Sequence, residues 1–337
     1  IKKEKILKLK ETNAKINVAI GLECANDKIL KKLNKGFKLK DFENAANLLH
    51  SLGCYVRTYL LVNLPIKNFE KELEKSVNYA LKFSDSIVLI NLLPHENSEI
   101  FNLWIRGEWK FLSREEFFKI TEKFKNEKIE LDVETFKFIP KFPENLQKKL
   151  VGVGEEFLTH PYYEIWQDYL CRWYKRDENK YIVLFLPCSA KKPYSESETH
   201  KKISSVLKKF ESEIIDKIHL VVISSPGVIP IEFENFYPFN SYDWNEKEEN
   251  DLIKERYIEV TKERIKRYLN AQKYKKIFCF LRYTETYKAL EKACNELNLK
   301  FKNFLKLETW NKIKNRKNPI ISDEALNDLE EGLKDIK

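Results

Sequence analysis

Methionine is absent from this sequence of 337 residues, which begins at Ile1. We therefore expect the natural N-terminus to lie upstream of the residues given. Long apolar runs are also missing, because no stretch approaches the roughly 18 residues that a membrane-spanning helix needs. We expect no association with a membrane. Hydrophobic residues make up 43% of the chain and aromatic residues 13%, which is enough for packed cores and excludes a globally disordered protein.

Cysteine is sparse, and its spacing excludes several kinds of site. No CxxC pair occurs, which argues against a zinc knuckle or a disulfide framework and suits a reducing cytosol. We therefore expect a cytoplasmic protein without a bound metal. The six cysteines are Cys24, Cys54, Cys171, Cys188, Cys279 and Cys294.

Basic residues exceed acidic ones, at 61 against 52, which gives a net charge of +9. The excess favours an anionic partner, with nucleic acid first, although a compositional bias toward lysine explains it equally well. One predicted helix, at about 248–269, offers basic side chains for phosphate contacts. Glutamates are interleaved with them, so a solvated face is the favoured interpretation. These basic residues are Lys254, Arg256, Lys262, Arg264, Lys266 and Arg267.

Strand and helix patterns alternate along most of the chain, which implies parallel strands joined by right-handed crossovers. The segment 138–160 interrupts this rhythm with two prolines and two of the eight glycines, so we place a domain boundary there. Before it we predict strands at 16–23, 54–65 and 85–94, with helices at 41–53 and 68–83. After it we predict strands at 180–187, 218–225, 276–282 and 299–305, and helices at 161–174, 196–210, 248–269 and 284–297.

Much chemistry is concentrated in one strand-to-helix junction, "LPCSAKKPYSESETH" at 186–200. Ser195 and Glu198 fit a capping box, which predicts that the helix begins at about residue 196. Cys188 would then lie at the carboxyl end of a strand and near a helix N-terminus, where open α/β sheets bind ligands and anions. Lys191 and Lys192 add positive charge. Both effects lower the pKa of a thiol, so Cys188 is a candidate thiolate.

Two further polar residues follow in the same helix. Ser197 and His200 are three residues apart and share one helical face. His200 could shuttle a proton. Taken singly, each residue of the junction also fits an ordinary role, either as a small core side chain or as a helix cap. The combination is more specific than its parts.

The junction resembles the Pro-Cys-Ser … Lys-Pro-Tyr … Ser … His signature of archaeosine synthase, a family of archaeal tRNA-modifying enzymes. The similarity extends over about residues 158–305, through "THPYYEIWQDYL" and "SSPGVIPIEFENFYPFNSYD". The resemblance implies a reaction that attaches the ε-amine of free lysine to the nitrile of 7-cyano-7-deazaguanine at position 15 of tRNA, with no cofactor. The positions that match the signature are Pro187, Cys188, Ser189, Lys192, Pro193, Tyr194, Ser197 and His200.

Roles for these residues are our hypotheses. We assign catalysis to Cys188, Ser189, Lys192 and His200. A thiolate at Cys188 could add to the nitrile and form a thioimide that lysine displaces. Equally, Cys188 could line the site while His200 or Glu232 deprotonates the incoming amine. We assign substrate binding to Pro187, Pro193, Tyr194, Ser197, Glu232, Tyr237 and Asp243.

Residues 1–140 resemble the back half of a radical SAM barrel, through "INVAIGLECANDKILKKLNKGF" and "DFENAANLLHSLGCYVRTYLLVNLP". The group is that of the Elongator catalytic subunit, which includes the radical SAM partner of archaeosine synthase. The resemblance implies a following C–N bond cleavage that uses S-adenosylmethionine and a [4Fe–4S] cluster in a complete domain. The CxxxCxxC motif for that cluster is absent, so we expect no such activity from this chain alone. Glu23 and Asn63 are candidates for lining the S-adenosylmethionine site, although ordinary strand-end roles are favoured.

The predicted architecture is α/β: part of a radical SAM-type (β/α) barrel at 1–140, then a second α/β domain with a mostly parallel sheet at 158–305, then a helical tail at 306–337. The predicted function is archaeosine biosynthesis by a fragment of a fusion enzyme. Its partners would be tRNA containing 7-cyano-7-deazaguanine, free lysine, and a transglycosylase or PUA-domain subunit that docks the tRNA. The alternatives are another radical SAM RNA-modifying enzyme and a non-catalytic tRNA-binding subunit.

Overall fold

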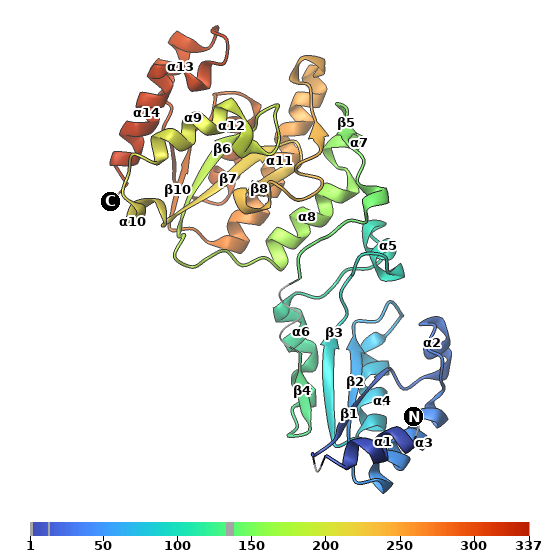
Figure 1. Ribbon diagram of the computed structural model, residues 1–337. Coiled ribbons are helices and arrows are strands. Elements are labelled where there is room, and N and C mark those ends of the chain that lie inside the picture. The colour runs from blue at the N-terminus through green and yellow to red at the C-terminus, as the bar shows by residue number, and fades with distance from the viewer. Residues whose placement is uncertain (1–2, 13, 133–137, 337) are drawn as a thin grey trace. The chain divides into compact units, whose positions relative to one another are not determined.

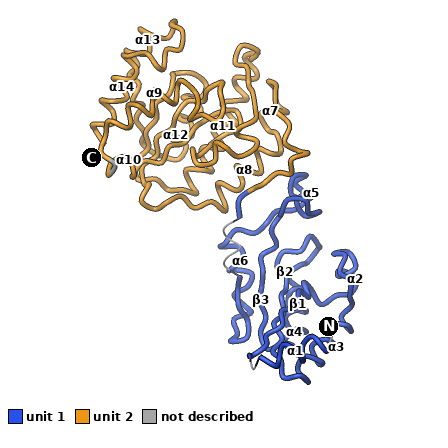
Figure 2. The backbone as a smooth tube through the Cα atoms, in the orientation of Figure 1, with its two compact units in different colours: residues 1–139 blue, residues 140–337 orange. Residues whose placement is uncertain are grey.

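A computed structural model describes residues 3–12, 14–132 and 138–336. The chain forms two compact units, unit 1 over Ile1–Ile139 and unit 2 over Pro140–Lys337 (Figure 2). Their division falls inside the segment 138–160, where prolines and glycines interrupt the α/β rhythm. No helix in the described ranges has both the length and the apolar composition to cross a membrane.

Unit 1 is built on a four-stranded sheet of order β1-β2-β3-β4, in which every neighbouring pair is parallel. This sequential order is the one that successive β/α units have in a barrel wall. The strands are β1 (Asn17–Glu23), β2 (Tyr55–Val62), β3 (Ser86–Asn91) and β4 (Ile129–Leu131). The helices are α1 (Lys3–Lys10), α2 (Asp27–Lys32), α3 (Leu39–Ser51), α4 (Phe69–Ala80), α5 (Glu99–Ile105), α6 (Arg114–Thr121) and the 3₁₀ turn η1 (Glu122–Phe124).

The core of unit 1 lies between this sheet and its helices. Leu60 of β2 and Leu89 of β3 are fully buried, and they belong to one apolar cluster with Phe42 of α3 and Val77 of α4. In β2, every second residue is buried, as a strand with one face on a core requires. Unit 1 therefore has an apolar core of its own.

Unit 2 contains a five-stranded sheet of order β11-β10-β6-β7-β8. Only β8 runs antiparallel to its neighbour within this sheet. All six residues of the central strand β6 are buried, as a continuous apolar run predicts for a sheet covered on both faces. The prediction of a mixed α/β protein with mostly parallel sheets is confirmed. The strands are β6 (Ile182–Pro187), β7 (Ile218–Ser224), β8 (Gly227–Pro230), β10 (Lys276–Cys279) and β11 (Phe301–Asn303).

The remaining elements of unit 2 surround this sheet (Figure 1). A separate two-stranded parallel sheet joins β5 (Leu150–Val151) to β9 (Tyr242–Asp243). The α-helices are α7 (Glu155–Leu158), α8 (Pro161–Arg172), α9 (Glu198–Leu207), α10 (Ser212–Ile215), α11 (Asp251–Gln272), α12 (Glu285–Glu296), α13 (Leu307–Ile313) and α14 (Asp323–Lys334). The 3₁₀ turns are η3 (Glu144–Leu146), η4 (Tyr194–Glu196), η5 (Ile231–Phe233), η6 (Glu246–Glu248) and η7 (Pro319–Ile321).

The C-terminal residues, predicted as a helical tail, form the helices α13 and α14. Helix α14 packs beside α9 (Figure 1), and Lys209 Nζ lies 2.6 Å from Glu330 Oε2. Leu329 and Leu333 are fully buried. Residues 306–336 therefore belong to the compact body of unit 2, because α14 buries an apolar face that the sequence alone did not assign to a partner.

One basic residue of α11, Arg264, differs from both predictions for this helix. Arg264 is only 2% exposed and donates hydrogen bonds to Glu164 and to the carbonyl oxygens of Leu158 and Ser225. It is neither a phosphate contact nor part of a solvated face. Four neighbours lie in ion pairs: Lys262 and Lys266 with Glu296, Arg256 with Glu155, and Arg267 with Glu164.

Candidate active site at the carboxyl end of the central strand

Cys188 directly follows β6, at the edge of the sheet where the parallel strands end. Pro187 of β6 is the register partner of Ile223 in β7, which brings Ser224 next to the cysteine. The Ser224 hydroxyl makes a hydrogen bond to the Cys188 side chain. The carboxyl ends of two neighbouring strands thus supply a thiol and a hydroxyl in contact, at the position where open α/β sheets bind ligands.

A chain of buried hydroxyls extends from this pair. The Tyr242 hydroxyl donates to Ser224 Oγ at 2.7 Å, and it is also hydrogen-bonded to the Tyr194 hydroxyl. Tyr194 is completely buried, and Tyr242 and Ser224 are almost so. A continuous hydrogen-bonded path therefore runs from Tyr194 to Cys188. Such a path can pass a proton between its members without water.

The pKa of Cys188 differs from the sequence-based expectation. Burial of the thiol raises its pKa above the usual value, and the carboxylate of Glu246 raises it further. Ser224, Arg282 and Lys192 lower it, but without cancelling the effect of burial. The folded protein therefore holds Cys188 as a neutral thiol near neutral pH, rather than as the thiolate that we expected from its position.

The two lysines of the junction behave differently. Lys191 extends to Glu196, with 3.2 Å between Nζ and Oε2, and both side chains are mainly exposed. Lys192 instead lies with its ammonium 3.9 Å from the centre of the Tyr242 ring. Burial lowers the pKa of Lys192, while the negative charge of Asp243 opposes that shift. Lys192 is therefore the lysine of the pair whose charge acts on the Cys188 thiol.

The helix after the junction begins two residues later than predicted. Helix α9 starts at Glu198, and its N-cap is Ser197, whose Oγ accepts a hydrogen bond from the backbone N–H of His200 at 3.1 Å. Ser195 lies in η4 instead, where its N–H donates to Glu234 Oε2 at 2.9 Å. The capping box that we predicted for Ser195 is therefore wrong. A 3₁₀ turn before the helix shifts the cap by two residues.

His200 is buried behind the strand end. Its Nε2 lies 2.9 Å from the carbonyl oxygen of Pro187, so this nitrogen carries the proton and donates it. Burial lowers the pKa of His200, which keeps the ring neutral at physiological pH. The imidazole thereby fixes the backbone immediately before Cys188. Ser189 shapes the same loop, because its hydroxyl donates to the carbonyl of Lys191 at 2.9 Å, and the following Lys192–Pro193 peptide bond is cis.

Glu232, one of the residues predicted to bind substrate, lies away from this cluster. Glu232 contacts His219 of β7, with 3.1 Å between Oε1 and Nε2. The register partner of His219 in β6 is Val183. Val183 precedes Pro187 by four residues along β6, or about 13 Å at the rise of a strand. The antiparallel strand β8 returns the chain to this opposite end of the sheet. Tyr237 uses its hydroxyl to donate to the carbonyl of Lys148 at 2.8 Å.

Asp243, another residue predicted to bind substrate, lies at the border of the cluster. Its carboxylate is 3.5 Å from Lys149 Nζ, and its charge acts on Lys192. It is therefore near the lysine of the cluster, although the structure gives it no contact with Cys188.

Sequence reasoning missed several residues of the cluster. The pKa of the Cys188 thiol is shifted by Ser224, Arg282 and Glu246. Ser224 and Arg282 come from the carboxyl ends of the strands on either side of β6, so adjacency in a parallel sheet was the signal that could have found them. Glu246 is the first residue of the 3₁₀ turn η6 after β9, and no local pattern marks it.

Unit 1 places Glu23 and Asn63 at the ends of β1 and β2, both with positive φ. The Glu23 carboxylate accepts a hydrogen bond from Lys35 at 3.0 Å. Asn63 is buried, and its Nδ2 donates to the carbonyl of Lys110 at 2.8 Å. Both side chains thus have partners within the protein, as the favoured structural interpretation requires.

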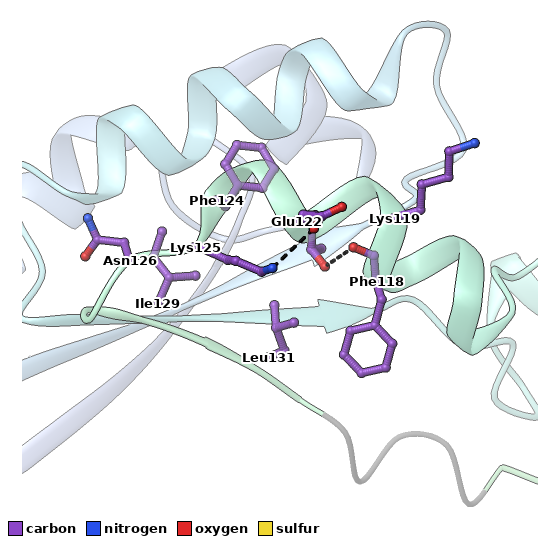
Figure 3. A pocket seen from close by; sticks show the side chains of 9 residues that line it. Phe118, Lys119, Glu122, Phe124, Lys125, Asn126, Ile129 and Leu131 are labelled. Carbon is purple, nitrogen blue, oxygen red and sulfur yellow. Dashed lines mark hydrogen bonds and ion pairs between the residues drawn. The ribbon is translucent and has the colours of Figure 1, made fainter.

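A pocket of about 420 Å³ in unit 1 lies elsewhere, between α6, η1 and β4 (Figure 3). Its lining includes Phe118, Phe124 and Leu131, with Lys125 beside Glu122 at 3.2 Å. None of the predicted site residues contributes to it. Within the described ranges, no three His, Cys, Asp or Glu side chains come together as metal ligands.

The geometry thus defines an α/β protein with a candidate thiol-centred site at the carboxyl end of a mostly parallel sheet. Residues 164–333, just over half of the chain, match the family described as "Domain of unknown function (DUF5591)". The chain belongs to this family, and the family region contains the whole cluster around Cys188.

Curated relatives are similar over shorter stretches. Archaeosine synthase of Haloferax volcanii is 30% identical over 161 residues, which cover 45% of this chain and 24% of that protein. Archaeosine synthase subunit alpha of Thermoplasma acidophilum is 34% identical over 107 residues, covering 30% and 18%. Archaeosine synthase subunit beta of Thermococcus kodakarensis is 31% identical over 121 residues, covering 33% and 37%. The chain thus spans about a quarter or less of the first two relatives.

Solved structures show weaker likeness. The crystal structure of AF0587, a protein of unknown function, has a TM-score of 0.34 and 22% identity, and the match covers 51% of this chain and 49% of that one. Elp3 of Methanocaldococcus infernus with an N-terminal deletion has a TM-score of 0.34 and 21% identity, and the match covers 39% of this chain and 32% of that one.

Proposed function

We propose that the chain acts in archaeosine biosynthesis, and that unit 2 adds free lysine to the nitrile of 7-cyano-7-deazaguanine in tRNA. The observation that carries this proposal is the cluster of Cys188, Lys192 and Ser224 at the carboxyl end of β6, inside the region that defines the family. The similarity to proteins named archaeosine synthase and to its subunits alpha and beta supports the substrate class.

The proposed reaction needs no net oxidation or reduction. A lysine ε-amine adds across the carbon–nitrogen triple bond, one N–H proton moves to the nitrile nitrogen, and the product is an amidine. Because a nitrile carbon is electrophilic, the Cys188 sulfur can add first. The thiol proton then goes to the nitrile nitrogen and a thioimide forms. Lysine attacks the same carbon, the C–S bond breaks, and the sulfur recovers a proton from the amine.

Several features support this route over direct addition with a general base. His200 directs its Nε2 proton to the carbonyl of Pro187, and Glu232 is engaged by His219 near the other end of β7. Neither group is presented at the thiol. A neutral Cys188 carries the proton that the nitrile nitrogen requires, and Lys192, whose pKa burial lowers, can return a proton to the sulfur. The hydroxyl chain through Ser224 and Tyr242 gives a second path.

We propose that this chain alone does not carry out the radical SAM step. The residues of unit 1 do not fit a [4Fe–4S] cluster, because Cys24 and Cys54 are both buried in separate apolar clusters. Burial raises the pKa of Cys24 to about 11, which opposes the thiolate that iron binding needs. We therefore propose that only a complete radical SAM domain binds S-adenosylmethionine and the cluster.

We also propose that tRNA docks with help from a transglycosylase or PUA-domain subunit.

The decisive test is incorporation of labelled lysine into tRNA that carries 7-cyano-7-deazaguanine. We expect incorporation by the wild type and a loss of at least about 100-fold in Cys188→Ala, because removal of a nucleophile disables the covalent route. Cys171→Ala is the matched control, since Cys171 is a partly exposed thiol on α8 of the same unit, and we expect it to retain activity. Acid trapping followed by mass spectrometry should detect the thioimide on Cys188.

Other outcomes separate the alternatives. Full activity of Cys188→Ala would remove the covalent route and leave direct addition with a general base. Absence of incorporation, with pre-modified tRNA and the partner subunit supplied, would contradict lysine transfer. It would then favour a non-catalytic tRNA-binding subunit.

A further inference from the structure

Arg282 stands beside Cys188 at the end of the neighbouring strand. Cys279 of β10 is the register partner of Phe185 in β6, and the backbone N–H of Phe280 continues the ladder by donating to Phe185 at 2.8 Å. Arg282 follows Cys279 by three residues, and Cys188 follows Phe185 by three residues. Both residues lie past the carboxyl ends of neighbouring parallel strands, and the charge of Arg282 acts on Cys188.

The guanidinium of Arg282 is paired with a carboxylate from another segment. Its Nη2 lies 2.9 Å from Glu246 Oε1 and 3.3 Å from Oε2. The Arg282 side chain is 31% exposed and that of Glu246 is 55% exposed, so solvent and small solutes reach the pair. Both charges act on the Cys188 thiol, Glu246 raising its pKa and Arg282 lowering it. An exposed ion pair of this kind is weak and exchanges partners readily.

Further carboxylates surround this pair. Burial raises the pKa of Glu249, and the negative charges of Glu246 and Glu285 raise it as well, while Lys254 lowers it, so the partner of Arg282 belongs to a group of three carboxylates. A phosphodiester brings only negative charge, and these carboxylates would repel it. An amino acid with a cationic side chain brings one carboxylate and two ammonium groups, which complement one guanidinium among several carboxylates.

We propose that Arg282 binds the α-carboxylate of the incoming free lysine and that Glu246 binds its α-ammonium group. The side chain of the amino acid then extends toward Cys188, and its ε-amine reaches the carbon attached to the sulfur. In the free protein Arg282 and Glu246 form an ion pair with each other. Bound lysine replaces this contact at both side chains, with its α-carboxylate on Arg282 and its α-ammonium group on Glu246. This inference rests on the lysine transfer proposed above and names the residues that recognise the acceptor.

The test compares lysine with two analogues that each lack one recognised group. Cadaverine has no α-carboxylate, and 6-aminohexanoic acid has no α-ammonium group. Binding is measured by titration calorimetry on the full chain, with and without modified tRNA, and transfer is measured as kcat/KM for each amine. We expect Arg282→Gln to lower kcat/KM for lysine by about 10- to 100-fold, as loss of a charge-assisted pair predicts. The lysine-to-cadaverine ratio should then fall toward one.

Glu246→Gln should lower the lysine-to-6-aminohexanoic acid ratio in the same way, while the cadaverine comparison stays as in the wild type. Arg316→Gln is the matched control, because Arg316 forms a similarly exposed pair with Glu324 in unit 2, at 2.8 Å. It should leave lysine affinity and both ratios unchanged. Arg282→Lys keeps the positive charge and should recover part of the lysine preference. Circular dichroism of each variant checks the fold.

The outcomes distinguish this inference from the proposed function. Lysine binding that Arg282→Gln abolishes, without transfer to tRNA, would support the amino-acid site and contradict the transfer reaction. Transfer with the same lysine-to-cadaverine ratio in wild type and Arg282→Gln would overturn the inference and leave the reaction standing. Absence of both binding and transfer would overturn both.

Discussion

At the scale of single residues, the reactivity of Cys188 is set by two opposing effects. Burial and Glu246 raise the pKa of the thiol, and hydrogen bonding from Ser224 with the nearby cations lowers it. Because burial dominates, the thiolate fraction near pH 7 is small. The protein thus holds a protonated sulfur at the site where the proposed lysine transfer needs a proton.

Alkylation kinetics test this conclusion. Only the thiolate reacts with iodoacetamide, so the rate at Cys188 should increase about tenfold per pH unit up to at least pH 9. The rate is measured by mass spectrometry of the Cys188 peptide, with the Cys171 peptide as an internal comparison. A plateau below pH 8 would contradict a raised pKa.

Glu232 gives a prediction about acid stability. Burial alone raises the pKa of this carboxyl, but hydrogen bonds and charge from His219, with a hydrogen bond from Tyr174, outweigh it and lower the pKa to about 2. A carboxyl whose pKa is lower in the folded state stabilises the protein above its unfolded pKa of about 4.3, and this contribution is lost as the pH falls toward 2.

We therefore expect the free energy of unfolding of wild type to decrease between about pH 4.3 and pH 2. Glu232→Gln should lower stability at pH 7 and flatten the pH dependence over this range. Urea denaturation at several pH values measures both effects. The exposed residue Glu178 supplies the control, since Glu178→Gln should leave the profile as in wild type. Identical profiles for Glu232→Gln and wild type would refute the argument.

At the scale of elements, the cap of α9 fixes the loop of the candidate site. The Ser197 hydroxyl satisfies a backbone N–H in the first turn, and the same turn carries His200 to the carbonyl of Pro187. One helix start therefore supports both the helix and the strand end that precedes Cys188.

Removal of this cap should lower the stability of the protein by a predictable amount. Ser197→Ala should lower the free energy of unfolding by about 1 kcal/mol, as loss of an N-cap side chain does. Ser195→Ala should have little effect, because its contact to Glu234 uses the backbone N–H rather than the hydroxyl. Chemical denaturation of the two variants compares them directly. A larger loss in Ser195→Ala would place the cap where the sequence pattern suggested.

At the scale of the whole molecule, each unit has its own sheet and core. All residues of the Cys188 cluster come from unit 2. We therefore expect a fragment of residues 140–337 to unfold cooperatively by itself and to retain the lysine binding of the full chain. Differential scanning calorimetry and titration with lysine measure this. A fragment that is folded yet binds no lysine, when the full chain does, would show that unit 1 contributes to the site.

The amino-acid sequence by itself determined the α/β class and the position of the main junction. Those features depend on local periodicity and on which residues follow a buried strand, so the apolar run before Cys188 and the helical pattern after it were sufficient. The two-residue error at Ser195 arose because a 3₁₀ turn and an α-helix start with similar residues.

Only the tertiary structure decided which distant residues surround Cys188. Ser224 and Arg282 join it because β7 and β10 flank β6 in register, and strand order is not encoded in any local pattern. Glu232, by contrast, is carried toward the opposite end of the sheet by the antiparallel strand β8. The sign of the Cys188 pKa shift was decided in the same way, because burial depends on everything packed around the thiol and outweighs the neighbouring charges that the sequence displays.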